Sequence, residues 1–537
     1  MVRSVCGGWC SRAPPPPPPA QSPAAAWRTA LHRVIFAPVG IPAGGPWTWN
    51  AACAAEAAAR NPGTLSASSF LLPAATDRPY LILGVAVLGP VAMVPHRPLR
   101  LRGYTLLEVA ALAAGVPRTL HVRYTSAVPG TRAKRINRLI GGYIEPWAFG
   151  GSLPPKTALP AGQPSGILAV APQETGLSLA AAAAASSFAP GGLMASQLPG
   201  RRLARRLGWS VPYFPPASPH HSASSARVTE MLLADGGCIT NPALHPLLQR
   251  GAKRCVVFLN FQTPLAARSA WDPAARAPTG ADCSEELPAL FGCVLDTPAW
   301  CFARNAVFPP ADLQRVACAL QDAAARGRGC VATVEHSTVA NAWWGIEAGH
   351  KVSVTWCYLS QASAWVDQLP SETRARLVDP KDAELGPSFP HFGTLDLSLS
   401  VVQVNLLHSL ASWTVHENAA EFAGALRSEA RGAEDGAREG TPGAAQTDQW
   451  GMPDILRGRG AGAQPASGAR SRVAAAGRVA ARAIAAAILG ATSSGPAPAA
   501  EDGAEAEAAS GAATPAERAR RAFASAFVRF KGLLPSG

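Results

Sequence analysis

One acidic residue followed by two glycines is the part of the sequence whose residue types and spacing could do chemistry. Asp235 ends an apolar run, and Gly236 and Gly237 follow it directly. Glycines let the backbone turn sharply and let another group approach closely. An aspartate placed there, at the end of a strand, could accept a proton from a hydroxyl. An Asp-Gly pair is also common in ordinary turns, and from these residues alone the turn is the more frequent outcome.

A serine nucleophile for such a base is not evident in the sequence. The string Gly-x-Ser-x-Gly, which places a reactive serine on a sharp turn between a strand and a helix, is absent from the chain. Similar strings at 162–166 and 493–495 lack a preceding strand or lie in an Ala-rich tail. In the segment Ser4–Trp9, Cys6 precedes two glycines and a tryptophan, but a strand cannot fit into the five residues before it. The residues therefore predict a base without an identified nucleophile.

Neither a metal nor a cofactor is expected from the sequence. Glu335, His336 and His350 lack the spacing of a ligand motif such as His-Glu-x-x-His, and a lone histidine among apolar residues is more often a hydrogen-bonded core residue. No Gly-x-x-x-x-Gly-Lys occurs, which argues against nucleotide hydrolysis. The eleven cysteines are scattered without Cys-x-x-Cys spacing, which indicates a reducing compartment and no structural zinc.

The elements that would position Asp235 alternate between strands and helices. The sequence predicts strands at 79–85, 167–170, 254–260 and 352–358, and helices at 104–114, 177–187 and 397–410. Most of the strands are apolar throughout, which is typical of a sheet covered on both faces. We therefore expect an α/β fold with a central, mostly parallel sheet.

Three segments, in a fixed order along the chain, carry a resemblance to a known family. They are Tyr143–Gly150, an aromatic and Glu-Pro stretch before a glycine; Leu179–Pro190, a small-residue run ending in Ser-Ser-x-x-Pro; and Leu232–Leu248, in which Asp-Gly-Gly is followed by Asn-Pro. Together they resemble the patatin and cytosolic phospholipase A2 family of lipid acyl hydrolases, over residues 60–262.

This resemblance implies a patatin-like sandwich and hydrolysis of an ester bond in a phospholipid or lysophospholipid. Asp235 would be the base of a Ser-Asp dyad, and Gly236 and Gly237 would lie against the substrate. Three alternatives stay open, because the serine and its glycine-rich oxyanion loop are missing. The chain is a fragment that has lost them, a pseudoenzyme of the same fold that binds lipid or protein, or an unrelated α/β protein.

Basic side chains are concentrated in one stretch of this chain, whose formal net charge is +13. The segment 97–138 contains nine lysines and arginines and one acidic residue, Glu108. We expect Arg97, Arg100 and Arg102 to meet headgroup phosphates at an anionic membrane surface. A nucleic-acid partner is not expected, because only two aromatic residues are interleaved with these cations.

The chain is expected to contain one large folded region between two disordered ends. A Pro/Ala-rich segment covers 1–26, the α/β domain 27–422 (informative core 60–262, accessory region 285–422), and an Ala/Gly/Arg tail 423–537 with two helices at 470–489 and 514–533. The longest apolar stretch, Tyr80–Val94, is too short for a membrane span. We therefore expect a cytoplasmic protein, peripheral to membranes.

Overall fold

The computed structural model describes residues 23–73, 79–94, 104–126, 134–151, 176–189, 191–192, 208–213, 228–293, 295, 304–382, 384–385, 389–392 and 399–426. Helices and strands both occur throughout this part, so the α/β class is confirmed. The strand predicted at 167–170 and the helices predicted at 470–489 and 514–533 lie outside the described residues.

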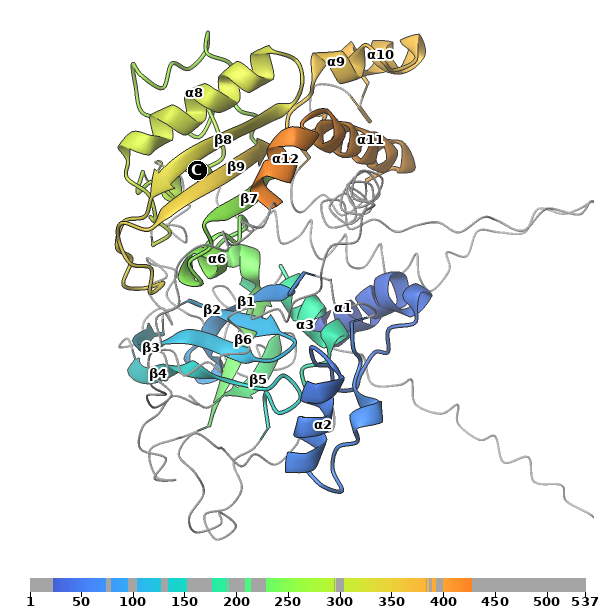
Figure 1. Ribbon diagram of the computed structural model, residues 1–537, viewed down its shortest axis with the longest axis vertical. Helices are drawn as coiled ribbons and strands as arrows, with labels where there is room; N and C mark the ends of the chain where they lie inside the picture. The colour runs from blue at the N-terminus through green and yellow to red at the C-terminus, as the bar shows by residue number, and fades with distance from the viewer. Residues whose placement is uncertain are drawn as a thin grey trace, which may run out of the picture. The chain divides into compact units, whose positions relative to one another are not determined.

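The larger sheet has six strands in the order β4-β3-β2-β1-β6-β5 (Figure 1). The strands are β1 (Ile82–Pro90), β2 (Thr105–Ala110), β3 (Ala114–Thr125), β4 (Arg135–Ile144), β5 (Trp209–Tyr213) and β6 (Thr229–Asp235). Every neighbouring pair in it is antiparallel, so the prediction of a mostly parallel central sheet is wrong. The reason is visible between β2 and β3, where Ala110 and Ala113 exchange backbone hydrogen bonds and leave no room for a crossover helix.

Both faces of this sheet are largely buried at its central strands β1, β2 and β6, as their apolar sequences predicted, whereas β3 and β4 also carry exposed residues. On one face Val85 and Val87 of β1 pack with Ala181 of α3 (Leu179–Ser186). On the other face Leu88 packs in a core that includes Val257 from the second sheet. The sheet therefore separates two apolar cores. One core lies between the sheet and α3, and the other lies between the sheet and the second sheet.

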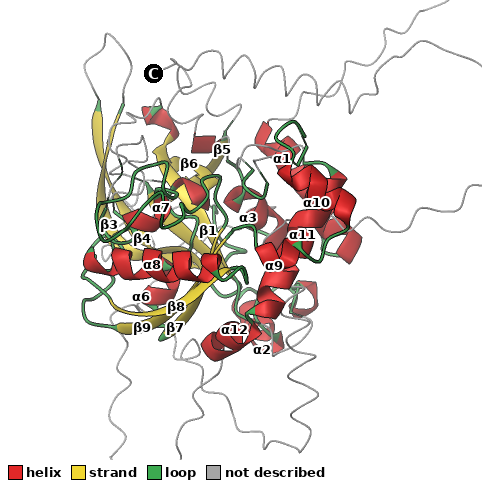
Figure 2. Cartoon of the chain, turned by 90° about the horizontal axis from the view of Figure 1, so that it is seen from above, coloured by secondary structure: helices red, strands yellow, loops and turns green. Residues whose placement is uncertain are grey.

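The second sheet has three strands in the order β7-β9-β8; β7 and β9 are parallel, and β8 and β9 are antiparallel. The strands are β7 (Arg254–Leu259), β8 (Cys330–Ser337) and β9 (Lys351–Tyr358). The strands predicted at 254–260 and 352–358 are confirmed. Helix α8 (Ala311–Ala325) packs along β8, and α12 (Ala419–Leu426) packs against β7 and β9 (Figures 1 and 2).

The described chain contains further α-helices, besides short 3-10 and π-helical segments. They are α1 (Pro23–Leu31), α2 (Ala51–Arg60), α6 (His245–Gln249), α7 (Glu286–Ala289), α9 (Ser363–Val366), α10 (Ser371–Val378) and α11 (Val401–Glu417). The helix predicted at 397–410 is confirmed as α11, whose start is fixed by a capping box between Ser400 and Gln403. Among the described helices, none combines the length and apolar character needed to cross a membrane.

The helix predicted at 104–114 is wrong, because this segment forms strand β2 and the turn after it. All six residues of β2 are buried, and residues 105–110 pair with 82–87 of β1. A short apolar run fits a buried strand and a buried helix equally well. Pairing with β1, a tertiary contact, decided between them.

Candidate functional site

Asp235 is the last residue of β6, next to the central strand β1 of the larger sheet. Its Cα pairs with that of Val85, and its backbone N–H donates to the carbonyl of Phe188 at 3.2 Å. One carboxylate oxygen accepts the backbone N–H of Gly237 at 2.7 Å. Burial raises the pKa of the Asp235 carboxyl, and this hydrogen bond opposes the shift. The aspartate is therefore held at a strand end as the sequence predicted, in an environment that makes it a stronger base.

The two glycines serve close packing at this turn. A Cβ at Gly236 would lie 2.4 Å from the carbonyl oxygen of Gly84 on β1, and one at Gly237 would lie 2.2 Å from Oδ1 of Asn241. The backbone N–H of Gly237 is engaged by Asp235. Two residues after Asn241, Ala243 adopts a φ of 50°, a left-handed conformation that costs a non-glycine residue energy. The whole turn is thus tightly constrained.

A buried glutamate, which the sequence reading did not single out, anchors this turn to α7. Glu286 is 6% exposed, and its Oε2 accepts the backbone N–H of Asn241 at 2.9 Å, while its Oε1 accepts the side-chain amide of the same residue. Burial raises the pKa of Glu286 to about 7, against the opposing effect of these hydrogen bonds, and the charges of Glu285 and Asp235 add to the rise. Asp235 therefore lies close enough to influence the ionisation of Glu286.

The C-terminal end of α3 and the residues after it also contact this turn and the strand beside it. The hydroxyl of Ser186 donates to the carbonyl of Gly84 at 2.7 Å, the carbonyl that also abuts Gly236. A Cβ at Gly191 would lie 2.8 Å from the Cβ of Ala234. The structure thus brings together two segments that the sequence singled out separately, the one ending in Ser-Ser-x-x-Pro and the one containing Asp-Gly-Gly. Among the described residues, no serine hydroxyl forms a hydrogen bond with the Asp235 carboxylate.

The third segment, Tyr143–Gly150, is tied to a different charged pair. The hydroxyl of Tyr143 donates to Glu108 at 3.3 Å, and Arg250 contacts the same Glu108 oxygen at 2.6 Å. Glu108 is 1% exposed, and its second oxygen has no hydrogen-bond partner. Glu145 forms an ion pair with Arg60 at 2.8 Å. These contacts stabilise the sheet and its junction with α6.

The remaining predicted residues are apart from this turn or outside the described chain. Arg97, Arg100 and Arg102 lie outside the described residues. His336 is buried and hydrogen-bonded to Asp312 at 2.8 Å, as expected of a core histidine. His350 contacts the backbone carbonyl of Ala252 at 3.1 Å. Within the part of the chain that is described, no three His, Cys, Asp or Glu side chains are arranged to hold a metal ion.

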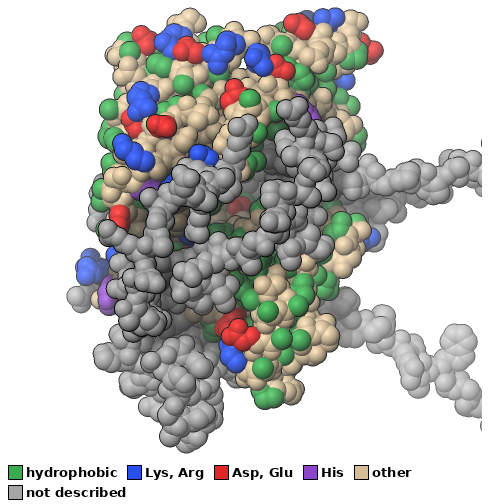
Figure 3. Space-filling model, in the orientation of Figure 1, with side chains coloured by type: hydrophobic (Ala, Val, Ile, Leu, Met, Phe, Trp, Pro, Cys, Tyr) green, Lys and Arg blue, Asp and Glu red, His purple; other side chains and the backbone are tan. Residues whose placement is uncertain are grey.

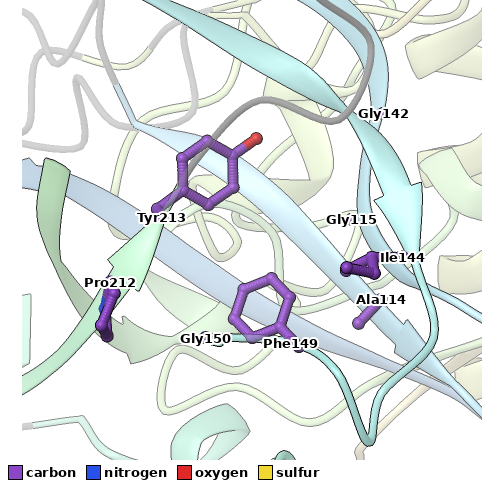
Figure 4. A pocket seen from close by; sticks show the side chains of 8 residues that line it. All are labelled: Ala114, Gly115, Gly142, Ile144, Phe149, Gly150, Pro212 and Tyr213. Atoms are coloured by element: carbon purple, nitrogen blue, oxygen red, sulfur yellow. The ribbon is translucent and has the colours of Figure 1, made fainter. Parts of the chain in front are cut away.

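A small cavity elsewhere in the larger sheet is too small for a substrate. It lies between β3, β4 and β5, and the rings of Phe149 and Tyr213 form part of its wall (Figure 4). Its volume is about 10 Å³, hardly enough for one water molecule. The hydroxyl of Tyr213 is engaged by the backbone N–H of Gly141 at 3.0 Å. This cavity is therefore a packing defect of the sheet.

Comparisons of the chain with protein-family models, with curated proteins and with solved structures each found no match.

Proposed function

We propose that this chain is a lipid acyl hydrolase-like protein, which hydrolyses an ester bond of a phospholipid or lysophospholipid with Asp235 as the base. The observation that carries the proposal is the turn itself. The carboxylate of Asp235 sits at the end of the largely buried strand β6, beside the central strand β1, fixed by the N–H of Gly237 and flanked by the segment that follows α3. The resemblance to patatins and cytosolic phospholipases is limited to the turn at Asp235 and the segment after α3. It does not extend to the sheet, whose strands are antiparallel.

The chemistry asked of Asp235 is removal of a proton from a serine hydroxyl as the serine attacks the ester carbonyl. An ordinary aspartate is a weak base at neutral pH, and burial that raises its pKa brings it closer to the range useful for proton transfer. The hydrogen bond from Gly237 keeps the carboxylate in one orientation. The alcohol portion of the ester would leave with that proton, and water would then hydrolyse the serine acyl-enzyme to the fatty acid and the free serine.

The decisive experiment measures ester hydrolysis and serine reactivity together. The full chain is assayed with 4-nitrophenyl butyrate and lysophosphatidylcholine, and with a fluorophosphonate probe that labels an activated serine wherever it lies. Asp235→Asn should lower hydrolysis and labelling by at least about 100-fold, the usual contribution of a general base. Asp272→Asn is the matched control, because Asp272 likewise accepts the backbone N–H two residues ahead, but at the surface. An active chain that is indifferent to Asp235→Asn would refute the assignment.

A second candidate is a non-catalytic lipid- or protein-binding member of the same fold. It is favoured by one observation, that no described serine hydroxyl is hydrogen-bonded to Asp235. This candidate predicts no fluorophosphonate labelling and no hydrolysis by the natural sequence. It also predicts sedimentation with anionic phosphatidylserine vesicles that is the same in Asp235→Ala. Loss of vesicle binding in that variant would argue against it.

A further inference from the structure

A groove lies at one edge of the three-stranded sheet. None of its lining residues belongs to β6 or to the turn that holds Asp235. It is bounded by the first residues of the parallel strands β7 and β9, the last residues of β8 and the first turn of α8. Its volume is about 700 Å³, in the range of sites for small organic molecules. On the face in Figure 3, acidic and basic side chains are interspersed over α8 to α10. The groove lining differs, because it is predominantly basic.

The charge of the groove comes from adjacent strand ends. Lys253 and Arg254 precede and begin β7, and Lys351 begins β9, whose Ser353 pairs with Arg254. Parallel pairing places these two strand beginnings side by side, so three cationic side chains converge from short stretches of backbone. Arg315 of α8 adds a fourth cation on the other wall. The carboxylates in the lining are those of Asp312 and Glu335, which leaves an excess of positive charge.

One of the four cations, Arg315, is fixed in place by a network that reaches into the core. The indole N–H of Trp356 donates to Nε2 of His336 at 3.3 Å. An indole can only donate, so Nε2 must be the acceptor and Nδ1 must carry the proton that it donates to Asp312 at 2.8 Å. His336 is therefore neutral, and both of its nitrogens are engaged. It is consequently unavailable as a catalytic base.

Asp312 connects His336 to Arg315 in the groove. Its second carboxylate oxygen accepts a hydrogen bond from Nη1 of Arg315 at 2.8 Å, and Nη2 of the same guanidinium donates to the backbone carbonyl of Glu335 at 2.9 Å. A guanidinium has five N–H groups, so these contacts hold the fork in one orientation and leave donors for a ligand. A fixed fork of this kind matches two oxygens of a phosphate better than it matches a single carbonyl.

We propose that this groove binds the phosphate of a phosphorylated organic molecule, with the Arg315 fork on the phosphate oxygens and Lys253, Arg254 and Lys351 around it. The ligand chemistry is a phosphomonoester dianion, because several cations and the hydroxyls of Ser337 and Ser353 line one space. The volume exceeds that of a free phosphate ion, so an organic portion is accommodated as well. The phosphate could belong to a soluble molecule or to a lipid headgroup.

The test uses inositol 1,4,5-trisphosphate in calorimetric titrations of the full chain, and sedimentation with phosphatidylcholine vesicles containing phosphatidylinositol 4,5-bisphosphate. Arg315→Gln and Lys351→Gln should each weaken binding at least about tenfold, as expected for lost charged hydrogen bonds. Arg315→Lys should restore little, because an ammonium cannot replace the fork. Lys381→Gln, an exposed lysine outside the groove, should leave binding unchanged.

Both sources of the phosphate remain distinguishable. Binding to the soluble probe alone supports a free phosphorylated ligand, and binding to vesicles at low protein concentration supports a headgroup. Thermal unfolding of each variant shows whether it is folded, and Lys351→Gln keeps the test valid if a change at Arg315 disturbs α8. Absence of binding in both assays overturns the proposal. Binding that is equally strong in Arg315→Gln and Lys351→Gln overturns it too.

A further variant separates positioning from simple attraction. Asp312→Asn removes one negative charge from the groove lining, so attraction alone predicts tighter binding of the trisphosphate. The network predicts weaker binding, because Arg315 loses the carboxylate that orients it. Tighter binding in Asp312→Asn would refute the fixed fork. The measurement does not depend on ester hydrolysis, so it stands or falls apart from the role proposed for Asp235.

Discussion

Replacing Glu286 by Gln should flatten part of the pH dependence of folding. Burial raises the pKa of Glu286 to about 7 from its ordinary value of 4.5. The folded state then holds this proton more tightly than the unfolded state does. Stability from this group is fully present below pH 4.5 and is lost as the pH rises to 7. A difference of this size corresponds to about 3 kcal/mol, and the 6% exposure of Glu286 means that solvent screens it little.

The assay is urea unfolding of the natural sequence and of Glu286→Gln at several pH values between 4.5 and 8. Glutamine stays neutral and can still accept one hydrogen bond from Asn241, so losing the other should cost about 1 kcal/mol at every pH. The difference between the two curves therefore isolates ionisation. This matters because burial lowers the pKa of His245 to about 4, which changes stability in the opposite direction between pH 4 and 6.5.

We compare the free energy of unfolding of Glu286→Gln with that of the natural sequence at each pH. Between pH 4.5 and pH 8, this difference should shift by about 3 kcal/mol in favour of the variant. Glu372→Gln, at an exposed position of α10, is the control and should run parallel to the natural sequence. If the Glu286→Gln and natural curves are parallel across this range, the carboxyl of Glu286 is not perturbed, and the burial-driven rise in its pKa must be abandoned.

Two further predictions concern buried contacts. Gly236→Ala should lower the free energy of unfolding in urea by about 2 kcal/mol, because its Cβ would meet the carbonyl of Gly84. Gly424→Ala on α12, where the space is open, is the control and should be neutral or stabilising. Equal effects of the two substitutions would contradict the close approach at Gly236. Arg250→Met should cost about 3 kcal/mol at pH 7, because it leaves the carboxylate of Glu108 buried and unpaired. Restored stability in the double variant with Glu108→Gln checks that cause, and no recovery would count against it.

The sequence was most informative where a local pattern was enough. The small-residue helix, the strand after the Asp-Gly-Gly segment and the alternating strand near residue 352 could be recognised from apolar runs and their length. The helix that became α11 was recognisable because residues within 397–410 recur at helical spacing. Burial of both faces at the central strands also followed from apolar runs without polar alternation. Strand direction did not follow, because burial on both faces is compatible with either direction.

The candidate site was predicted in part. Asp235 could be singled out because two glycines follow it at the end of an apolar run. Glu286 could not, because 44 residues separate it from its partner Asn241 and its surrounding sequence carries no motif. The same holds for the pair of Glu108 and Arg250, joined between β2 and the end of α6.

The sequence by itself thus determined several of the elements, among them α3, β7, β9 and α11, and the local turn that holds Asp235, since these depend on neighbouring residues. Tertiary structure alone decided which distant side chains surround that turn, and how Arg315 is oriented through Asp312 and His336. It also decided whether residues 105–110 form a helix or a strand, through pairing with β1. Ionisation belongs with these decisions, because the pKa of Glu286 depends on burial and on charges that only folding brings near it.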